Sequence, residues 1–222
     1  MAKSRTALVA GATGLTGKHL LEFLLADARY ASVHALVRKA ALPTHPKLSE
    51  HVIDFESLPK LSKTDAAFCC LGTTIRKAGS QAAFRKIDFD YVLNFAAAAK
   101  AAGAKQFLVV SALGANAKSA VFYNRVKGEM ENALKAMNFE SLHIFRPSFL
   151  MGKRADARVG ERLGIKVFSA LAPLMIGPAR KVRPVEAKAV ARAMVLAASG
   201  DALGVTVVES DEILALNELH SQ

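Results

Sequence analysis

TALVAGATGLTG, residues 6–17, is the stretch that decides the fold, because an apolar run stops there at a turn rich in glycine. Residues 6–10 are apolar and long enough for a β-strand. Gly11, Gly14 and Gly17 then recur at every third position, and a helical pattern of apolar residues follows them. This order predicts a strand, a tight glycine turn and a helix.

The same turn has the features of a phosphate site. A pyrophosphate is bound by backbone N–H groups, and glycine lets the backbone approach closely, while the helix N-terminus adds unpaired donors and a partial positive charge. Gly11 would make the turn, Gly14 would admit the pyrophosphate, and Gly17 would let the helix pack on its strand. An ordinary loop in an alanine- and glycine-rich chain is the alternative. The fixed spacing between a strand and a helix favours a dinucleotide site.

Length and composition indicate one globular domain. The chain has 222 residues, of which 52% are hydrophobic and 22% charged, so residues 1–222 are expected to form a single domain. No apolar run approaches the ~18–20 residues of a membrane helix, so no membrane partner is expected. Cys69 and Cys70 are adjacent within an apolar run, which indicates buried strand packing rather than a disulfide framework. A reducing, cytoplasmic setting is therefore expected.

The net charge of +11 raises the question of a nucleic-acid partner. The 30 lysines and arginines are spread along the whole chain, and aromatic residues make up only 7%. A solvated basic surface that attracts a phosphorylated cofactor explains the charge better, so nucleic-acid binding is not favoured. The six histidines show no metal-ligand spacing, and no metal is expected.

The end of the second predicted strand, at residues 32–37, bears on the choice of cofactor. Nucleotide-binding units that prefer NAD place an acidic residue about 20 residues after the glycines, where it bonds the ribose 2′-hydroxyl. Here that place holds Arg38 and Lys39. A guanidinium and an ammonium would attract a 2′-phosphate, so NADP(H) is favoured over NAD(H). Two ordinary surface charges are the alternative.

The rest of the chain alternates strands and helices. Further strands are predicted at residues 52–55, 66–71, 106–110, 141–145 and 205–208, and helices at 81–103, 185–198 and 212–219. This alternation predicts an α/β fold with a doubly wound, mainly parallel sheet of the Rossmann type and helices on both faces. Ligands bind such sheets outside the carboxyl ends of the strands, where strand order reverses. Gly72, Thr73 and Thr74, after the fourth strand, should therefore face the cofactor. Asp88 and Asp90 are expected on the solvated side of their helix.

A tyrosine and a lysine carry the candidate chemistry. Tyr123 precedes Lys127 by four positions on a predicted helix, which puts both side chains on one face. A nearby ammonium stabilises a phenolate, which suits the tyrosine to exchange a proton with a carbonyl group. Ser111, at the end of the fifth strand, could hydrogen-bond the same oxygen. The spacing alone is weak, but together with the glycine turn and the serine it predicts a reductase site.

The late segment at residues 148–183 is less regular, with a predicted helix at 161–171. Its apolar residues, among them Leu163, Phe168 and Met175, could line the pocket of a small-molecule substrate. They could equally form core or a dimer surface, so the sequence leaves open a monomer or a homodimer.

With these residues in place, the chain resembles the atypical short-chain dehydrogenase/reductase superfamily, and within it the Tat-interacting-protein-like oxidoreductases. The resemblance covers nearly the whole chain and is carried by six motifs: GATGLTG (11–17), CCLGTT (69–74), KAG (77–79), DYVL (90–93), YNRVKGE (123–129) and FRPSFL (145–150). It implies a Rossmann fold that binds NADP(H). The leading hypothesis is an NADPH-dependent oxidoreductase that transfers a hydride to a carbonyl group or an activated double bond.

The resemblance also implies roles for single residues. The proton donor would be Tyr123, and Lys127 would bind the ribose. The remaining cofactor contacts would be Thr13, Gly14, Leu15 and Thr16 at the pyrophosphate, Arg38 and Lys39 at the 2′-phosphate, Leu71 and Gly72 along the cofactor, Leu150 at its nicotinamide end, and Arg158 as a further contact.

The chain departs from the family pattern at one position. Relatives carry paired serines where this chain has Ser111 followed by Ala112, and in better-understood reductases the catalytic serine falls on the second position. Ser111 is then the candidate substitute. An NADP(H)-binding regulatory protein with little or no turnover is the alternative function.

Overall fold

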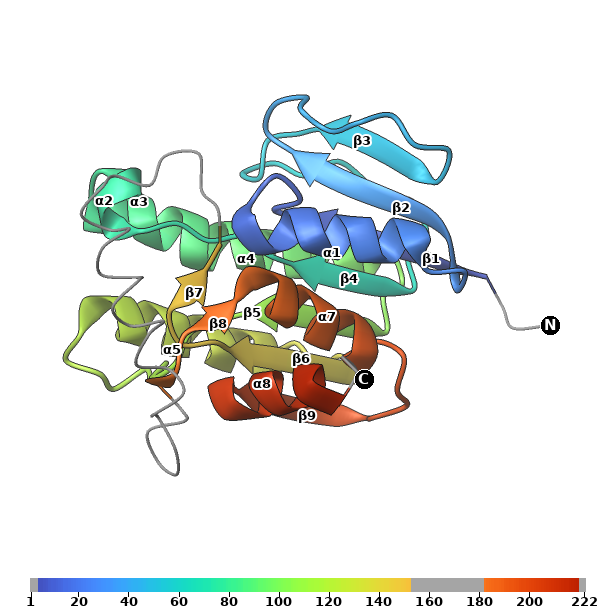
Figure 1. The fold of residues 1–222 in the computed structure, drawn as a ribbon. Helices are drawn as coiled ribbons and strands as arrows, with labels where there is room; N and C mark the ends of the chain where they lie inside the picture. The colour runs from blue at the N-terminus through green and yellow to red at the C-terminus, as the bar shows by residue number, and fades with distance from the viewer. Residues whose placement is uncertain (1–3, 153–181, 220–222) are drawn as a thin grey trace.

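The computed structural model describes residues 4–152 and 182–219 and shows a parallel sheet in the order β3-β2-β1-β4-β5-β6-β9 (Figure 1). Every neighbouring pair in this sheet is parallel. The strands are β1 (Arg5–Ala10), β2 (Tyr30–Val37), β3 (Leu48–Val52), β4 (Ala66–Cys69), β5 (Gln106–Val110), β6 (Ser141–Arg146) and β9 (Gly204–Glu209). This order reverses between β1 and β4, as the doubly wound prediction requires.

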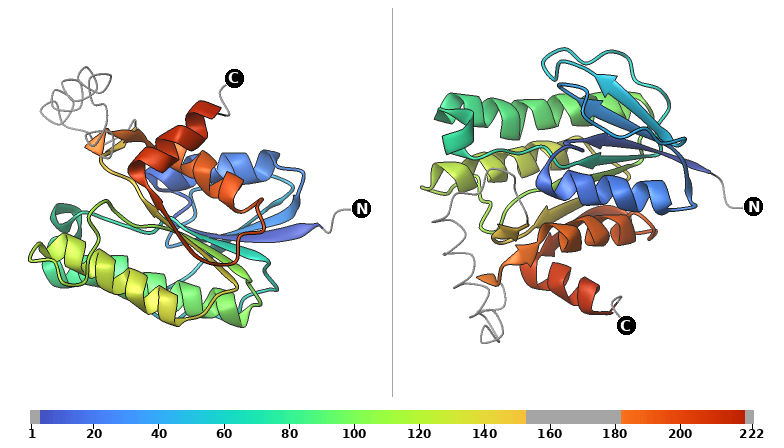
Figure 2. Two further views of the ribbon diagram at one scale, coloured as in Figure 1. Left: turned by 90° about the horizontal axis from the view of Figure 1, so that it is seen from below. Right: turned by 45° about the horizontal axis from the view of Figure 1, so that its top comes forward.

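Helices cover both faces of the sheet (Figure 2). On one face lie α1 (Leu15–Ala26), α7 (Ala187–Ala197) and α8 (Ser210–Leu219), and on the other lie α4 (Tyr91–Ala101) and α5 (Phe122–Ala136). Two buried apolar clusters, one on each face, fill the space between helices and strands. The predicted Rossmann-type α/β fold is confirmed.

Smaller elements gather at the carboxyl ends of the strands (Figure 1). They are α2 (Ile75–Ala78), α3 (Gln81–Arg85), and a second, two-stranded parallel sheet of β7 (Leu150–Met151) and β8 (Val185–Glu186). The predicted helix at 161–171 lies outside the described residues.

The third strand was predicted in the wrong place. It spans Leu48–Val52 rather than 52–55, because an edge strand can be polar and half exposed, as LSEHV is, and so lacks an apolar run. Phe55 follows the strand and is buried, with its ring stacked on that of Tyr91 at 5.8 Å between centroids. The apolar character of 52–55 therefore reflects core packing next to the strand.

The predicted helix at 81–103 is divided into three pieces. A π-helical turn, η1 (Lys86–Asp90), joins α3 to α4. Asp88 lies in this turn and is 1% exposed, so the prediction that it lies on the solvated side was wrong. Asp90 is exposed, as predicted.

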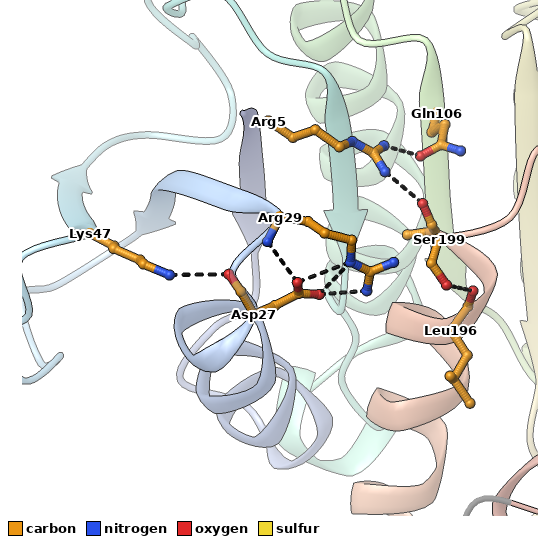
Figure 3. A network of polar contacts seen from close by, with 8 residues as sticks. Arg5, Asp27, Arg29, Lys47, Gln106, Leu196 and Ser199 are labelled. Atoms are coloured by element: carbon orange, nitrogen blue, oxygen red, sulfur yellow. Dashed lines mark hydrogen bonds and ion pairs between the residues drawn. The ribbon is translucent and has the colours of Figure 1, made fainter. Parts of the chain in front are cut away.

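A network of polar contacts lies at the amino ends of the strands (Figure 3). Arg5 donates a hydrogen bond of 2.7 Å to the carbonyl of Ala198 and another to Gln106, which joins β1, β5 and the loop after α7. Asp27 accepts hydrogen bonds from Arg29 after α1. These contacts fix the edge opposite the carboxyl ends.

Candidate functional site

The glycine turn is closed so tightly that side chains would not fit at two of its positions. Gly11 has a φ of +83°, and a Cβ atom there would lie 2.5 Å from the carbonyl carbon and oxygen of Cys70. A Cβ atom on Gly17 would lie 2.0 Å from the carbonyl oxygen of Gly11. The turn therefore packs directly on the end of β4, and α1 packs directly on the turn.

The first turn of α1 is open to an anion. Gly14 is the N-cap residue, it provides no side-chain cap, and no acidic residue lies in the first turn. The N–H groups at the start of a helix have no partner within the helix, and the helix dipole favours negative charge there. Thr13 is exposed beside these groups, Leu15 is half-buried, and Thr16 is buried. Turn and helix together fit a pyrophosphate.

The loop after β4 runs beside this turn. The Cys70 N–H donates to the carbonyl of Ala10 at 2.8 Å, so the segments that follow β1 and β4 leave the sheet side by side. Leu71 is half-buried and Gly72 is exposed. Next along the loop, the Thr73 N–H donates to Oδ2 of Asp88 at 2.9 Å, and this hydrogen bond fixes the loop to the buried carboxylate.

Helix α5 presents Tyr123 and Lys127 one turn apart, as predicted. The ring of Tyr123 is half-buried and packs at a tilt on the buried ring of Phe84, with centroids 5.3 Å apart. The Lys127 side chain is 3% exposed, and its Nζ lies 2.7 Å from Oδ1 of Asp88. Helix α3 and the π turn therefore hold both residues of the Tyr-x-x-x-Lys motif.

Electrostatic interactions keep Lys127 charged in this buried place. Burial by itself lowers the pKa of an ammonium. The charge of Asp88, together with that of Tyr123 in its phenolate form, outweighs burial, and the pKa of Lys127 is raised above its ordinary value.

Ser111 is buried at the end of β5, but its hydroxyl faces a carboxylate. Ser111 Oγ donates to Oε1 of Glu131 at 2.5 Å, and Glu131 also accepts from Arg146 at 2.6 and 3.0 Å. A serine hydroxyl has one proton to donate. In this arrangement Ser111 can accept a further hydrogen bond, and it must release Glu131 before it can donate one. Ala112, in the next position, is also buried.

Arg38 and Lys39 directly follow β2 and are exposed. Leu36 of β2 lies opposite Ala10 of β1, so these two cations leave the sheet at the same edge as the glycine turn. Neither side chain forms an ion pair within residues 4–152 and 182–219.

The last predicted contacts involve the chain after β6. Leu150 is half-buried in β7. A Cβ atom on Gly152 would lie 2.6 Å from a methyl carbon of Leu15, so the end of β7 lies against the glycine turn. Arg158 lies outside the described residues.

Three residues of the site were not found from the sequence: Asp88, Glu131 and Arg146. Asp88 lies 39 positions before its partner Lys127, and Glu131 lies 20 positions after its partner Ser111. A signal was available for Glu131, since it lies one turn after Lys127 on the same helix and hence on its buried face.

A family model described as NAD(P)H-binding matches residues 11–158, which include the glycine turn, the loop after β4 and the Tyr-x-x-x-Lys motif. The chain belongs to this family. It is 38% identical to Protein HTATIP2 of Rattus norvegicus over 176 residues, which cover 76% of this chain and 72% of the relative. It is 36% identical to Protein FMP52, mitochondrial, of Eremothecium gossypii over 223 residues, covering 95% and 96% of the two chains. The predicted kinship with atypical short-chain dehydrogenases/reductases is confirmed.

Solved structures confirm the fold. MoeE5 in complex with UDP-glucose and NAD matches with a TM-score of 0.68 and 20% identity, over 97% of this chain and 82% of that chain. A UDP-glucose 4-epimerase from Thermotoga maritima matches with a TM-score of 0.65 and 17% identity, over 97% and 82%. Within the described part of this chain, no helix combines the length and apolar character needed to span a membrane.

Proposed function

We propose that the protein is an NADP(H)-dependent oxidoreductase that reduces a small carbonyl compound or an activated double bond. One observation carries the proposal. Tyr123 lies one helical turn from a buried, charged Lys127, and the loop after β4 links this pair to the edge where the glycine turn presents its N–H groups. A nucleotide and a group that exchanges protons would meet there.

Residues 13–16 of the glycine turn and the start of α1 would hold the pyrophosphate, with the backbone N–H groups of Leu15 and Thr16 among the donors. The Gly14 N–H donates to the carbonyl of Gly11 at 2.9 Å, so Gly14 would contribute by letting the phosphate approach closely. Leu71, Gly72 and Thr73 would line the middle of the cofactor, Leu150 its nicotinamide end, and Lys127 would bond the ribose. The exposed cations Arg38 and Lys39 would bind the 2′-phosphate, which is the basis for proposing NADP(H) over NAD(H). The cofactor, when bound, supplies the hydride.

Tyr123 would donate the proton that the substrate oxygen or carbon needs. When its hydroxyl loses that proton, the charged ammonium of Lys127 stabilises the phenolate that remains. The packing of the Tyr123 ring on Phe84 fixes its direction, so little reorganisation accompanies the transfer. Ser111 would add a hydrogen bond to the substrate after releasing Glu131.

A second function has an observation in its favour. The hydroxyl proton of Ser111 is directed to Glu131, and Ala112 supplies no hydroxyl in its place. A protein built in this way could bind NADP(H) and change its affinity for a partner without catalysis.

Turnover separates the two functions. Purified protein is incubated with NADPH and a panel of aldehydes, ketones and enones, and loss of NADPH is followed by absorbance. The reductase proposal predicts a substrate whose turnover falls at least about 100-fold in Tyr123→Phe, with NADPH affinity unchanged. Tyr91→Phe is the matched control, because that hydroxyl bonds Glu56 on the surface. Turnover that survives Tyr123→Phe would refute the role of Tyr123, and no turnover with any compound would favour the regulatory function.

We propose that residues 1–222 form one domain. The cytoplasmic setting proposed from the cysteines gains no support from the relatives, because the name of FMP52 places that protein in mitochondria.

A further inference from the structure

The π turn η1 lets the buried residues of the successive pieces α3, η1 and α4 lie on one side, which faces α5. The buried residues of α3, η1 and α4 include Phe84, Asp88 and Val92, spaced by four. In a regular α-helix, two side chains that are eight positions apart point in directions that differ by roughly 80° around the helix axis. The extra residue in a π turn removes most of that displacement, so all three residues can face the same side.

This face meets the Tyr-x-x-x-Lys motif at matching intervals. Phe84 packs on Tyr123, and four positions later Asp88 pairs with Lys127, which is four positions after Tyr123. π turns of this kind are frequent at functional sites. The second contact is charged and fully buried, whereas the first is apolar.

Asp88 joins three separate parts of the site. Its Oδ1 lies 2.7 Å from Lys127 Nζ, its Oδ2 accepts the Thr73 N–H at 2.9 Å, and the carboxylate belongs to the π turn itself. A Cβ atom on Gly72 would lie 3.3 Å from Oδ1 of Asp88 and 3.9 Å from Lys127 Nζ. The ion pair therefore lies directly beneath the exposed backbone of Gly72.

We infer that Asp88 is a positioning residue of the cofactor site, which holds the Lys127 ammonium charged and fixed beneath Gly72 for the cofactor ribose. The inference rests on the proposed function, because it assumes that Lys127 binds the ribose of NADP(H). A buried ammonium without its carboxylate partner would be strongly destabilised. Asp88 thus acts on the cofactor through Lys127.

The groups around Lys127 determine how this role can be tested. Asp88 of η1, Tyr123 of α5 and Cys69 of β4 interact with its charge, and Glu131, one turn further along α5, is engaged by Arg146. With Asp88 neutral, burial becomes dominant and lowers the pKa of Lys127. The ammonium would then lose its proton as the pH rises, while in the wild type it stays protonated.

The test follows NADPH affinity against pH by cofactor fluorescence, from pH 6.5 to 9.5, in the wild type, Asp88→Asn and Asp90→Asn. Asparagine keeps an oxygen for the Thr73 N–H, removes the charge, and places an amide NH2 where the oxygen that faces Lys127 Nζ was. We expect affinity in Asp88→Asn to fall by up to about tenfold per pH unit above the lowered pKa of Lys127. The wild type and Asp90→Asn, whose side chain is exposed in the same turn, should change by less than about twofold over that range.

A double-mutant cycle with Lys127→Met gives a second readout. If Asp88 acts through Lys127, Asp88→Asn weakens NADPH binding when Lys127 is present and changes it little in the Lys127→Met background. The double variant buries no unpaired charge and should resist urea better than either single variant. If Asp88→Asn alone unfolds, this difference in urea resistance becomes the readout of the coupling, and a double variant no more stable than Asp88→Asn would contradict it.

Two results would overturn the inference while leaving the proposed function intact: the same pH profile in Asp88→Asn and the wild type, or an equal loss of affinity with and without Lys127. A wild-type protein that binds no NADPH at any pH would overturn the proposed function, and the inference with it.

Discussion

The Ser111 hydroxyl donates a hydrogen bond of 2.5 Å to Oε1 of Glu131, and both side chains are buried. Arg146 bonds Glu131 on one side and Oε1 of Glu209 on the other, at 2.9 Å. A chain of polar groups thus runs from the end of β5 to the end of β9. Within this row of polar groups, Ser111 has Glu131 as a structural partner, in addition to its proposed role at the substrate.

Ser111→Ala should lower the free energy of unfolding by about 1–3 kcal/mol, because the residue donates to a buried carboxylate. Urea denaturation measures the change. Ser62→Ala, at an exposed position before β4, is the control and should change stability by less than about 0.5 kcal/mol. Equal stability of Ser111→Ala and wild type would show that the hydrogen bond to Glu131 contributes nothing.

Gly17→Ala should disrupt the glycine turn, since its Cβ would lie 2.0 Å from the carbonyl oxygen of Gly11 and the backbone would have to move. We expect a loss of about 1–3 kcal/mol in stability and at least a tenfold loss in NADPH affinity. Gly200→Ala is a matched control, because its Cβ would make an ordinary contact at 3.6 Å. The close packing of the turn would be refuted if both variants bound NADPH like the wild type.

His143 should make the fold sensitive to mild acid. Its side chain is buried in β6, Nε2 contacts the Ser141 hydroxyl at 2.9 Å, and Nδ1 has no partner among the described residues. Burial lowers its pKa from the ordinary value of 6.5, so the folded state favours the neutral ring. Its contribution to stability is therefore complete above pH 6.5 and is lost as the pH falls toward the lowered pKa.

The measurement compares wild type with His143→Gln by urea denaturation between pH 8 and pH 5. The stability difference between the two should shift against the wild type by at most about 1.4 kcal/mol per pH unit below pH 6.5. His34, whose pKa is also lowered by burial and by His51, is present in both proteins, so its effect on stability cancels in the difference. A constant difference across this range would contradict the account of His143.

The thiols of the adjacent residues Cys69 and Cys70 should be unreactive in the native protein. Cys69 is completely buried, and burial raises the pKa of its thiol to about 12, so roughly one molecule in 10⁴ carries the thiolate at pH 8. Burial also raises the pKa of Cys70. A disulfide reagent such as DTNB should modify neither thiol within minutes at pH 8, and both after unfolding in urea. Rapid modification of the native protein would contradict the burial of these thiols.

The glycine turn, the strand ends and the Tyr-x-x-x-Lys helix could be predicted because each depends on residues close together in the sequence. Gly11 and Gly17 are required by contacts within one turn and with the next strand of the sheet. Tyr123 and Lys127 share a helix face through their spacing alone.

Asp88 could not be predicted in this way, because its burial depends on a π turn and on a lysine of another helix. The same holds for Ser111, whose position at the strand end was predicted while its bond to Glu131 was not. An edge strand such as β3 lacked a signal because one of its sides is solvated. Local patterns therefore predicted the candidate residues Ser111, Tyr123 and Lys127, and the contacts that orient them required the structure.

The most direct test of the central claim is a titration of NADPH and NADH into the wild type, Arg38→Asp and Lys63→Asp, followed by cofactor fluorescence or calorimetry. We expect the wild type to prefer NADPH by at least about tenfold, because in the proposed site the exposed Arg38 and Lys39 would bind the 2′-phosphate. Arg38→Asp should remove that preference. Lys63→Asp makes a similar change of charge on an exposed residue before β4 and should keep the preference. Equal affinity of the wild type for the two cofactors, or a preference that survives Arg38→Asp, would contradict the account.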